Sequence, residues 1–561
     1  MKLTGAQILM EVFKEEGVDS IFGFPGGATI DMHDQLENTA IRHYLVRHEQ
    51  GAVHAADGYA RVSGKVGVCL VTSGPGATNA VTGVATAYLD SIPLVIVCGQ
   101  VPTHLIGNDA FQEVDIVGIT RPCTKHNYLV PSVEELPRIL REAFHIARSG
   151  RPGPVLVDIP KNVQQGTTDF KPGQKIRLKS YNPTYKPNAK QLGKVADMIK
   201  AAERPLIFAG GGVILSGAAE ELTRLARMAQ IPVTMSLMGL GAFPGSDRLS
   251  LGMVGMHGTY RANMSTAACD LMIGIGVRFD DRVTGKTDCF AAQAQIVHID
   301  IYPTSIRKNV PVSIPVVGDC KSSLEAINRY LAETDPGELT ARRGPWLDQI
   351  DRWRQDFKMA YTQEDEIKPQ YVVEKLYELT HGDAIITTEV GQNQMWAAQY
   401  YHFDRPGHFV TSGGLGTMGF GLPAAIGAQV AFPDALVVDV AGDGSIQMNI
   451  QEMATAMQYK LPVKVVILNN CYLGMVRQWQ ELFYEKRYAC TCLDHGPDFV
   501  KLAEAFGAVG LRAEHPDEVE AVLRRGLETP GPVIMDFKVS REECVYPMVP
   551  AGAPITEMLL V

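Results

Sequence analysis

The chain has 561 residues, with 52 lysines and arginines against 62 aspartates and glutamates, which gives a formal net charge of −10. At about 150 residues per domain, this length predicts three or four globular domains. An apolar fraction of 46% and a charged fraction of 20% exclude a disordered or fibrous chain, and the mildly acidic balance gives no electrostatic footprint for nucleic acid or an anionic membrane.

No apolar run approaches the length of a membrane-spanning helix, since the longest candidates, such as 92–98, have the length of a strand. The first seven residues already begin an amphipathic helix, so we expect no signal or transit peptide. The ten cysteines are scattered and form no CxxC pair, which is typical of reduced, buried thiols rather than of a zinc site or a disulfide framework. We therefore expect a cytoplasmic protein that engages no membrane.

The first block of the chain, 1–163, alternates helical patterns with short β-rich runs. These runs lie at 20–24, 66–72, 94–98 and 155–159. Such alternation is the signature of a parallel sheet with crossover helices. The polar stretch 164–190 contains several prolines and no sustained period, so we expect a linker there.

Two further blocks repeat the α/β alternation. The second spans 191–332 and the third 369–540, with a charged, partly helical linker at 333–368 between them and a short tail at 541–561. Blocks one and three share a Gly-rich turn after a β-rich run, at 73–79 and again at 412–418, which suggests two related sheets. The sequence therefore predicts an α/β chain with three doubly wound parallel sheets.

The strongest chemical signal lies in the third block. A predicted strand ends in Gly442-Asp443-Gly444, and the next predicted strand ends in Asn469-Asn470. In a βαβ unit both strands point the same way, so Asp443 and Asn470 reach the same carboxyl edge of the sheet, where such sheets bind ligands. A carboxylate, an amide oxygen and a nearby carbonyl suit Mg²⁺ that shares its remaining positions with a diphosphate and water.

The same residues carry a family resemblance. Gly442-Asp443-Gly444 followed by Asn469-Asn470 resembles the thiamin-diphosphate motif, and the likeness extends over all three blocks. The segments 47–51 (RHEQG), 107–113 (GNDAFQE), 278–285 (RFDDRVTG) and 474–479 (GMVRQW) resemble the catalytic subunits of acetohydroxyacid synthases. This resemblance implies an N-terminal pyrimidine-binding domain, a central FAD-binding domain, and a C-terminal domain for the diphosphate and Mg²⁺.

The resemblance also implies roles for residues around thiamin diphosphate. Glu49, at an expected βα turn, would hydrogen-bond the aminopyrimidine, and Met418 would be the apolar wedge that holds the cofactor bent. Gln392 and Asn393 would present amides to the diphosphate; the family commonly has His at the second position, so Asn393 leaves a neutral donor there. The remaining implied contacts are Gly442, Gly444 and Ser445 for the cofactor, with Tyr472 joining Asp443 and Asn470 at the metal.

In the second block, glycines follow two predicted strands at 210–212 and 274–276, and Asp300 ends a third. These features are compatible with a dinucleotide, although the full GxGxxG fingerprint is absent. By resemblance the FAD contacts are Arg151, His257, Arg278, Asp300 and Asp319.

A last group matches family residues around the reacting centre. Taken singly each residue has an ordinary structural role, but as a set they suit a 2-ketoacid: a guanidinium receives the carboxylate, and an indole face bounds the short alkyl group. The group comprises Phe111, Gln112, Lys161, Met256, Arg282 and Trp479.

The sequence therefore predicts an enzyme that decarboxylates pyruvate on thiamin diphosphate and joins the resulting hydroxyethyl carbanion to a second pyruvate or to 2-ketobutyrate. The products would be 2-acetolactate and 2-aceto-2-hydroxybutyrate, precursors of branched-chain amino acids. Partners implied by the resemblance are a second copy of the chain, as homodimer or homotetramer, and a separate small regulatory subunit. Three alternatives stay open: an FAD-free catabolic acetolactate synthase, a pyruvate oxidase or decarboxylase on the same fold, and a nucleotide-binding regulatory paralogue without activity.

Overall fold

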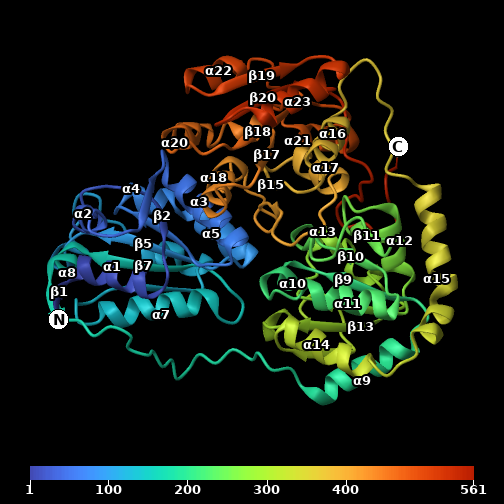
Figure 1. The fold of residues 1–561 in the computed structure, drawn as a ribbon, viewed down its shortest axis with the longest axis horizontal. Coiled ribbons are helices and arrows are strands. Elements are labelled where there is room, and N and C mark those ends of the chain that lie inside the picture. The colour runs from blue at the N-terminus through green and yellow to red at the C-terminus, as the bar shows by residue number, and fades with distance from the viewer. Residues whose placement is uncertain (561) are drawn as a thin grey trace.

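The computed structural model describes residues 1–560, which form three six-stranded parallel sheets flanked by helices (Figure 1). The N-terminal sheet has the strand order β3-β2-β4-β5-β7-β6. Its strands are β2 (Ser20–Phe24), β3 (Arg42–Leu45), β4 (Gly67–Val71), β5 (Leu94–Gln100), β6 (His126–Leu129) and β7 (Val155–Pro160). Its helices are α1 (Gly5–Glu15), α2 (Ile30–Leu36), α3 (Glu49–Ser63), α4 (Pro75–Asn79), α5 (Val81–Asp90), α6 (Ile116–Thr120), α7 (Leu136–Arg148) and α8 (Lys161–Gln165).

The central sheet has the order β11-β10-β9-β12-β13-β14, in which the first strand along the chain lies in the middle and the order reverses beside it, as in dinucleotide-binding folds. Its strands are β9 (Pro205–Ala209), β10 (Val233–Met235), β11 (Ser250–Met253), β12 (Leu271–Ile275), β13 (Gln295–Asp300) and β14 (Ile314–Val317). Its helices are α9 (Ala189–Ala201), α10 (Gly211–Leu215), α11 (Ala219–Ala229), α12 (Tyr260–Ala268), α13 (Asp281–Thr284) and α14 (Cys320–Leu331).

The C-terminal sheet has the order β16-β15-β17-β18-β20-β19, which repeats the topology of the N-terminal sheet strand for strand. Its strands are β15 (Ile385–Thr388), β16 (Phe409–Val410), β17 (Val437–Gly442), β18 (Lys464–Asn469), β19 (Val509–Ala513) and β20 (Val533–Lys538). Its helices are α16 (Pro369–Thr380), α17 (Gln392–Tyr400), α18 (Gly421–Ala431), α19 (Asp443–Ile446), α20 (Met453–Gln458), α21 (Gly474–Phe483), α22 (Phe499–Ala505) and α23 (Val519–Glu528). The prediction of two related sheets is confirmed.

The segments expected as linkers carry more structure than their composition suggests. Residues 167–169 form β8 (Thr167–Asp169), which pairs with β1 (Lys2–Thr4) in a two-stranded antiparallel sheet. The charged segment 333–368 contains α15 (Pro336–Asp356), whose Trp346 is buried and donates a hydrogen bond to the Pro205 carbonyl at 3.1 Å. Three-residue strands show no period, which is why β1 and β8 escape sequence analysis.

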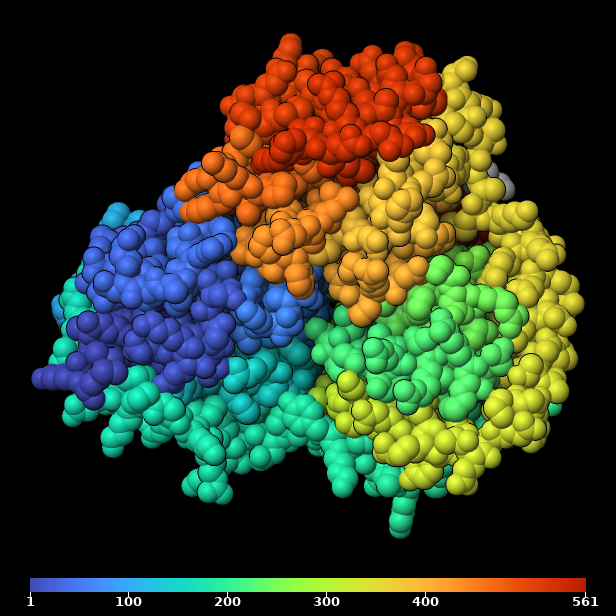
Figure 2. Space-filling view, viewed as in Figure 1, coloured from blue at the N-terminus to red at the C-terminus, as the bar shows by residue number. Residues whose placement is uncertain are grey.

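Two helices made of small residues join the N-terminal and C-terminal sheets. A Cβ added to Gly427 of α18 would lie 1.8 Å from the Ala55 carbonyl of α3, and one added to Gly58 would lie 2.2 Å from the Ala424 carbonyl. The backbones of α3 and α18 therefore touch, and no larger side chain fits between them. Figure 2 shows the resulting packing of the N-terminal lobe, in blue, against the orange part of the C-terminal lobe.

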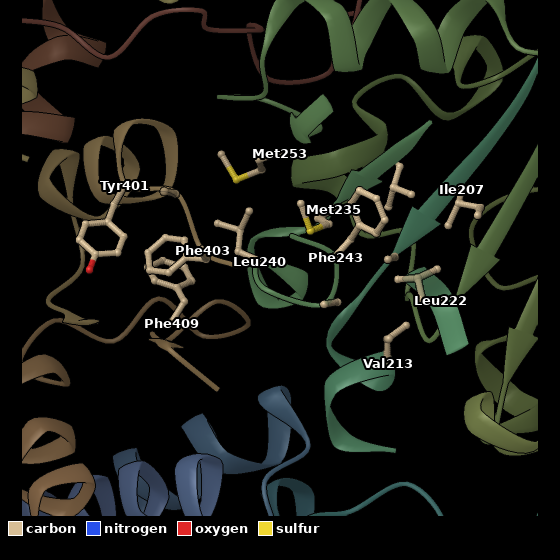
Figure 3. Close-up of a cluster of buried hydrophobic side chains, with 14 of the residues drawn as sticks. Ile207, Val213, Leu222, Met235, Leu240, Phe243, Met253, Tyr401, Phe403 and Phe409 are labelled. Atoms are coloured by element: carbon tan, nitrogen blue, oxygen red, sulfur yellow. The ribbon is translucent and has the colours of Figure 1, made fainter. Parts of the chain in front are cut away.

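The central and C-terminal lobes share one apolar core. Buried side chains of the central lobe, such as Leu240 and Met253, pack toward Phe403 and Phe409 of the C-terminal lobe (Figure 3). The tail crosses back to the central lobe, where Lys286 donates a backbone hydrogen bond to the Ala553 carbonyl at 3.0 Å. Among the described residues no helix combines the length and the apolar character needed to cross a bilayer.

The contact between α3 and α18 generates the first prediction. Gly427→Ala would force a methyl group into a backbone carbonyl, so we expect the free energy of unfolding to fall by about 1–3 kcal/mol or more. Urea denaturation followed by circular dichroism measures the change. Gly193→Ala in α9 is the matched control: a Cβ there meets nothing within 4 Å, so that variant should be up to about 1 kcal/mol more stable. Equal stability of the two variants would contradict the proposed close contact.

Candidate active site

A cavity of about 610 Å³ lies where the three lobes meet. Its walls come from the carboxyl ends of the central strands, the end of α5, and the α17 and α21 regions of the C-terminal lobe. Of the residues predicted to bind cofactor or substrate, nine line it: Arg151, Met256, His257, Arg278, Arg282, Asp300, Asp319, Met418 and Trp479. The structure thus gathers residues that are more than 300 positions apart in the sequence.

The central-lobe side of the cavity has the features that a dinucleotide needs. A Cβ on Gly212 would lie 2.6 Å from the Gly276 Cα, so the backbones of the turns after β9 and β12 are in direct contact at these two glycines. No side chain from either glycine extends into the cavity. Arg278 donates to the Leu89 carbonyl at 2.7 Å and Arg151 to the Ser91 hydroxyl at 2.7 Å, which brings two guanidinium groups to the same wall.

The charges on this wall are only partly compensated. Burial, followed by the charge of Arg278, lowers the pKa of Arg151, whereas burial raises the pKa of Asp300 to about 6. An anionic pyrophosphate would offset the repulsion between the two arginines, so the residues present fit a dinucleotide. His257 faces the cavity as a neutral ring, since burial lowers its pKa to about 4.

The edge of the C-terminal sheet carries the predicted metal residues. Strands β17 and β18 are adjacent and parallel, with Gly442 paired to Leu468, so Asp443 and Asn470 follow neighbouring strand ends as predicted. Both side chains are buried, at 4% exposure each, and the Asn470 oxygen accepts a hydrogen bond from the Tyr472 N–H at 3.1 Å.

Burial raises the pKa of Asp443 to about 7, and a divalent cation would offset the cost of keeping this carboxylate charged. The described residues contain no cluster of three or more His, Cys, Asp or Glu that could hold a metal. A cation here would instead combine one carboxylate with neutral oxygens, as Mg²⁺ beside a diphosphate does.

Gln392 and Asn393 begin α17 beside this edge. Gln392 donates to the Gln478 side chain and to the Glu543 carbonyl, both at 2.9 Å. Asn393 donates to the backbone carbonyls of Glu389 at 3.0 Å and Val440 at 2.8 Å. Both N–H groups of Asn393 therefore hold backbone carbonyls in this arrangement, and its contact with the diphosphate stays a prediction.

Ser445, expected to contact the cofactor, donates its hydroxyl to Glu389 Oε2 at 2.6 Å. Glu389 and the neighbouring Asp439 are both fully buried, and sequence analysis did not single out either residue. The sequence carried a weak signal, since Glu389 directly follows a β-rich run and Asp439 lies inside one, and carboxylates are almost never fully buried unless they are paired. Their partners lie on other elements, so the sequence could not identify them.

Arg282 and Trp479 meet at the cavity although they come from different lobes. The guanidinium carbon of Arg282 lies 5.8 Å from the centre of the Trp479 ring, within the range of a cation–π contact. Arg282 is 56% exposed and makes two further weak contacts, each at 3.9 Å, one from its Nε to the carboxylate of the exposed Asp281 and one to the sulfur of Met256. Its fork is therefore available to a carboxylate in the cavity.

Apart from Arg151, the predicted residues of the N-terminal lobe lie away from this cavity. Glu49 is the first residue of α3, is 8% exposed, and accepts a hydrogen bond from Asn79 at 2.9 Å. Lys161 begins α8 and donates to the Gly27 carbonyl at 2.7 Å. Gln112 has a left-handed backbone, and its neighbour Phe111 is 87% exposed. Within one chain these four residues do not line the cavity that contains Met418 and Trp479.

Each of the three lobes matches a domain of a known protein family. Residues 3–119 match the "Thiamine pyrophosphate enzyme, N-terminal TPP binding domain", residues 192–327 the "central domain", and residues 389–537 the "C-terminal TPP binding domain". The three matches appear in the order that the sheets take along the chain. These matches define the class as enzymes that use thiamin diphosphate.

Curated relatives narrow the class. The chain is 49% identical over 565 residues to the acetolactate synthase isozyme 3 large subunit of Escherichia coli, covering 100% of this chain and 98% of the relative. It is 49% identical to an acetolactate synthase large subunit of Mycobacterium tuberculosis, with coverage of 99% and 91%, and 48% identical to a chloroplastic acetolactate synthase of Nicotiana tabacum, with coverage of 99% and 85%. The chain therefore belongs to the thiamine pyrophosphate enzymes and, within them, to the acetolactate synthase family.

The sheet-edge pair generates a metal-binding prediction. Asp443→Ala removes the charged ligand and should weaken Mg²⁺-dependent binding of thiamin diphosphate by about a hundredfold or more, while Asn470→Ala should weaken it by about tenfold. Isothermal titration of the purified chain measures both. The exposed Asp434→Ala serves as control and should bind like the unmodified chain. Unchanged affinity in both site variants would remove these residues from the metal site.

Proposed function

We propose that this chain is the catalytic subunit of an acetolactate synthase that decarboxylates pyruvate and joins the remaining two carbons to a second pyruvate or to 2-ketobutyrate. The products would be 2-acetolactate and 2-aceto-2-hydroxybutyrate, which serve branched-chain amino-acid biosynthesis. The single observation that carries the proposal is the Arg282–Trp479 pair, which faces a cavity shared with Met418 and the dinucleotide wall. A carboxylate receptor beside an aromatic wall is what a short 2-ketoacid acceptor requires.

Three cofactors belong to the proposal. Thiamin diphosphate, when bound, supplies the electron sink for decarboxylation of a 2-ketoacid. Asp443, Asn470 and the Tyr472 carbonyl would hold Mg²⁺ beside the diphosphate, and the apolar Met418 would support the cofactor from the cavity side. Arg151, His257, Arg278, Asp300 and Asp319 would hold FAD, which the net reaction does not need as an electron acceptor.

Arg282 and Trp479 would divide the selection of the second ketoacid between them. Arg282 can fix the acceptor's carboxylate with two parallel hydrogen bonds, which holds the acceptor within bonding distance. Trp479 can pack against the extra methylene of 2-ketobutyrate. Because the two side chains come from α13 and α21, the relative placement of two lobes sets the size of the acceptor pocket.

Assembly from at least two copies is part of the same proposal. Glu49, Phe111, Gln112 and Lys161 do not line the cavity of their own chain, so they would serve the cavity of a second copy. Phe111, at 87% exposure, and Met448, at 54%, are apolar side chains that a partner surface would cover.

A regulatory partner and a cellular compartment complete the proposal. Relatives bear the name large subunit, which supports a separate small regulatory subunit. The ten cysteines are all free, in keeping with the reducing cytoplasm.

Hybrid assemblies test the shared site. Glu49→Gln and Asp443→Ala chains should each be inactive as homo-oligomers, whereas mixing equal amounts should restore about a quarter of normal activity, because about half of the dimers are then hybrids and each hybrid retains one of its two sites. Subunit exchange is verified by mass spectrometry of differently tagged chains. No recovery despite proven exchange would contradict a site shared between two copies.

A competition assay tests the function itself. With thiamin diphosphate, Mg²⁺, pyruvate and 2-ketobutyrate, the unmodified chain should form both acetohydroxyacids and show the visible absorption of bound flavin. Trp479→Leu should keep acetolactate formation but lose a 2-ketobutyrate preference of roughly tenfold to two-hundredfold, which is what one methylene in an apolar pocket provides. Arg282→Ala should lose ligation with both acceptors and release acetaldehyde instead.

The product pattern discriminates between the alternatives. Acetaldehyde alone from the unmodified chain would indicate a decarboxylase, and acetolactate from a colourless protein would indicate the FAD-free catabolic enzyme. An unchanged product ratio in the Trp479 variant, or normal ligation in the Arg282 variant, would overturn the roles assigned to these side chains.

A further inference from the structure

Glu389 is a carboxylate that the sequence motifs do not explain. It directly follows β15 and is fully buried. Its Oε2 accepts hydrogen bonds from the Ser445 hydroxyl at 2.6 Å and from the Gly419 N–H at 2.7 Å, and its Oε1 accepts one from the Leu422 N–H at 3.2 Å. The Gly419 N–H also donates to the Ser445 hydroxyl oxygen at 3.2 Å. A buried carboxylate with three donors is a strong structural constraint, because burying polar groups without partners is costly.

These three donors belong to two different turns. Gly419 directly follows Met418, and Leu422 lies in the first turn of α18, so the carboxylate holds the N-terminal end of that helix. A negative charge at this end is favourable because the first N–H groups of a helix have no intrahelical acceptor. Ser445 belongs to α19, which begins with Asp443. One side chain therefore connects the turn that carries Met418 with the turn that carries Asp443.

The neighbouring carboxyl group, that of Asp439 on strand β17, accepts fewer hydrogen bonds than Glu389 does. Its Oδ1 accepts from the Thr387 hydroxyl at 3.2 Å, and its Oδ2 has no hydrogen-bond partner within the part of the chain that the structure describes. Burial and then the charge of Glu389 raise the pKa of Asp439 well above its usual range. Burial raises the pKa of Glu389 as well, but three donors converge on Glu389 and one on Asp439, so Glu389 is the carboxyl that holds the turns.

The turn between these carboxyl groups has little room. A Cβ on Gly421 would lie 2.2 Å from Asp439 Oδ1 and 2.6 Å from the Glu389 backbone nitrogen. The chain after Met418 is thus pressed against Glu389 and Asp439, and its path depends on them.

We propose that Glu389 is a positioning residue, which fixes the turn bearing Met418 relative to the turn bearing Asp443 and Ser445. The proposal rests on the proposed function, in which Met418 supports thiamin diphosphate and Asp443 holds its metal. It also assigns Ser445 a different task from the expected one: the hydroxyl hydrogen of Ser445 is committed to Glu389, so the hydroxyl connects the two turns rather than donating to a diphosphate.

Glu389→Gln tests the proposal with almost no change in side-chain size. An amide has one acceptor oxygen in place of two, so at least one of the three donors must face an NH₂ group. Asp439→Asn is the matched control, because it makes the same chemical change in the same buried pocket and touches none of Gly419, Leu422 or Ser445. Thermal unfolding confirms that each variant is folded.

The first measurement uses the chain without cofactors. Hydrogen–deuterium exchange of peptides covering 415–425, read by mass spectrometry, should be about tenfold or more faster for the Gly419 and Leu422 amides in Glu389→Gln, and unchanged in Asp439→Asn. Unaltered protection in the Glu389 variant, or equal loss in both variants, would overturn the proposal.

The second measurement adds thiamin diphosphate and Mg²⁺. Glu389→Gln should bind the cofactor about tenfold or more weakly and slow the exchange of its C2 hydrogen, as a displaced Met418 would, whereas Asp439→Asn should match the unmodified chain. If the unmodified chain does not bind thiamin diphosphate, the proposed function fails, while the exchange data without cofactor still decide the role of Glu389.

A third variant covers the case in which Glu389→Gln does not fold. Ser445→Ala removes a hydroxyl that donates to Glu389 and also accepts from the Gly419 N–H at 3.2 Å, so the Gly419 amide would respond directly to its loss. The Leu422 amide contacts Glu389 alone, and its exchange should become several-fold faster while the chain stays folded. Where both variants fold, the double variant should lose no more cofactor affinity than Glu389→Gln alone, because the hydroxyl acts through Glu389. Additive losses, or normal Leu422 exchange in Ser445→Ala, would overturn the proposal.

Discussion

The direct contact between the backbones of α3 and α18 is the constraint on which the arrangement of the lobes depends. Gly58 and Gly427 allow these helices to approach so closely that a single added methyl group would overlap a carbonyl oxygen. Such an interface cannot slide, because interiors packed at this density do not deform continuously. It fixes the N-terminal sheet against the C-terminal sheet. The central sheet is then attached through an apolar core that it shares with the C-terminal lobe.

Given that arrangement, the position of the site follows from sheet topology. Ligands of parallel α/β sheets bind beyond the carboxyl ends of the strands, and here the central and C-terminal sheets present those ends to a common cavity. Arg61 adds a buried electrostatic tie: it contacts Asp90 at 2.8 Å and the Thr411 carbonyl at 2.9 Å, so the N-terminal lobe also holds the strand end that precedes the turn bearing Met418. Arg61 therefore holds the chain before Met418, and Glu389 holds the chain directly after it.

Much of the fold and part of the candidate site could be predicted from the sequence. The strands after which the chemistry-bearing residues fall are short apolar runs ended by glycine or asparagine, so their existence and order are local properties. The pairing of Asp443 with Asn470 at one edge follows from the rule that successive parallel strands point the same way. Contacts such as Glu389 with Ser445 could not be predicted, because 56 positions separate the partners and no period or motif connects them.

By itself the sequence determined the three α/β blocks, the family, and which residue types carry the chemistry, since all of these depend on local patterns and short motifs. Only the tertiary structure decided which of those residues meet. It brought Arg282 to Trp479, used the amide of Asn393 to hold backbone carbonyls, and left Glu49 outside the cavity of its own chain. The physical reason is that each outcome depends on packing between lobes and on competition for hydrogen-bond partners, which the chain settles only when it is folded.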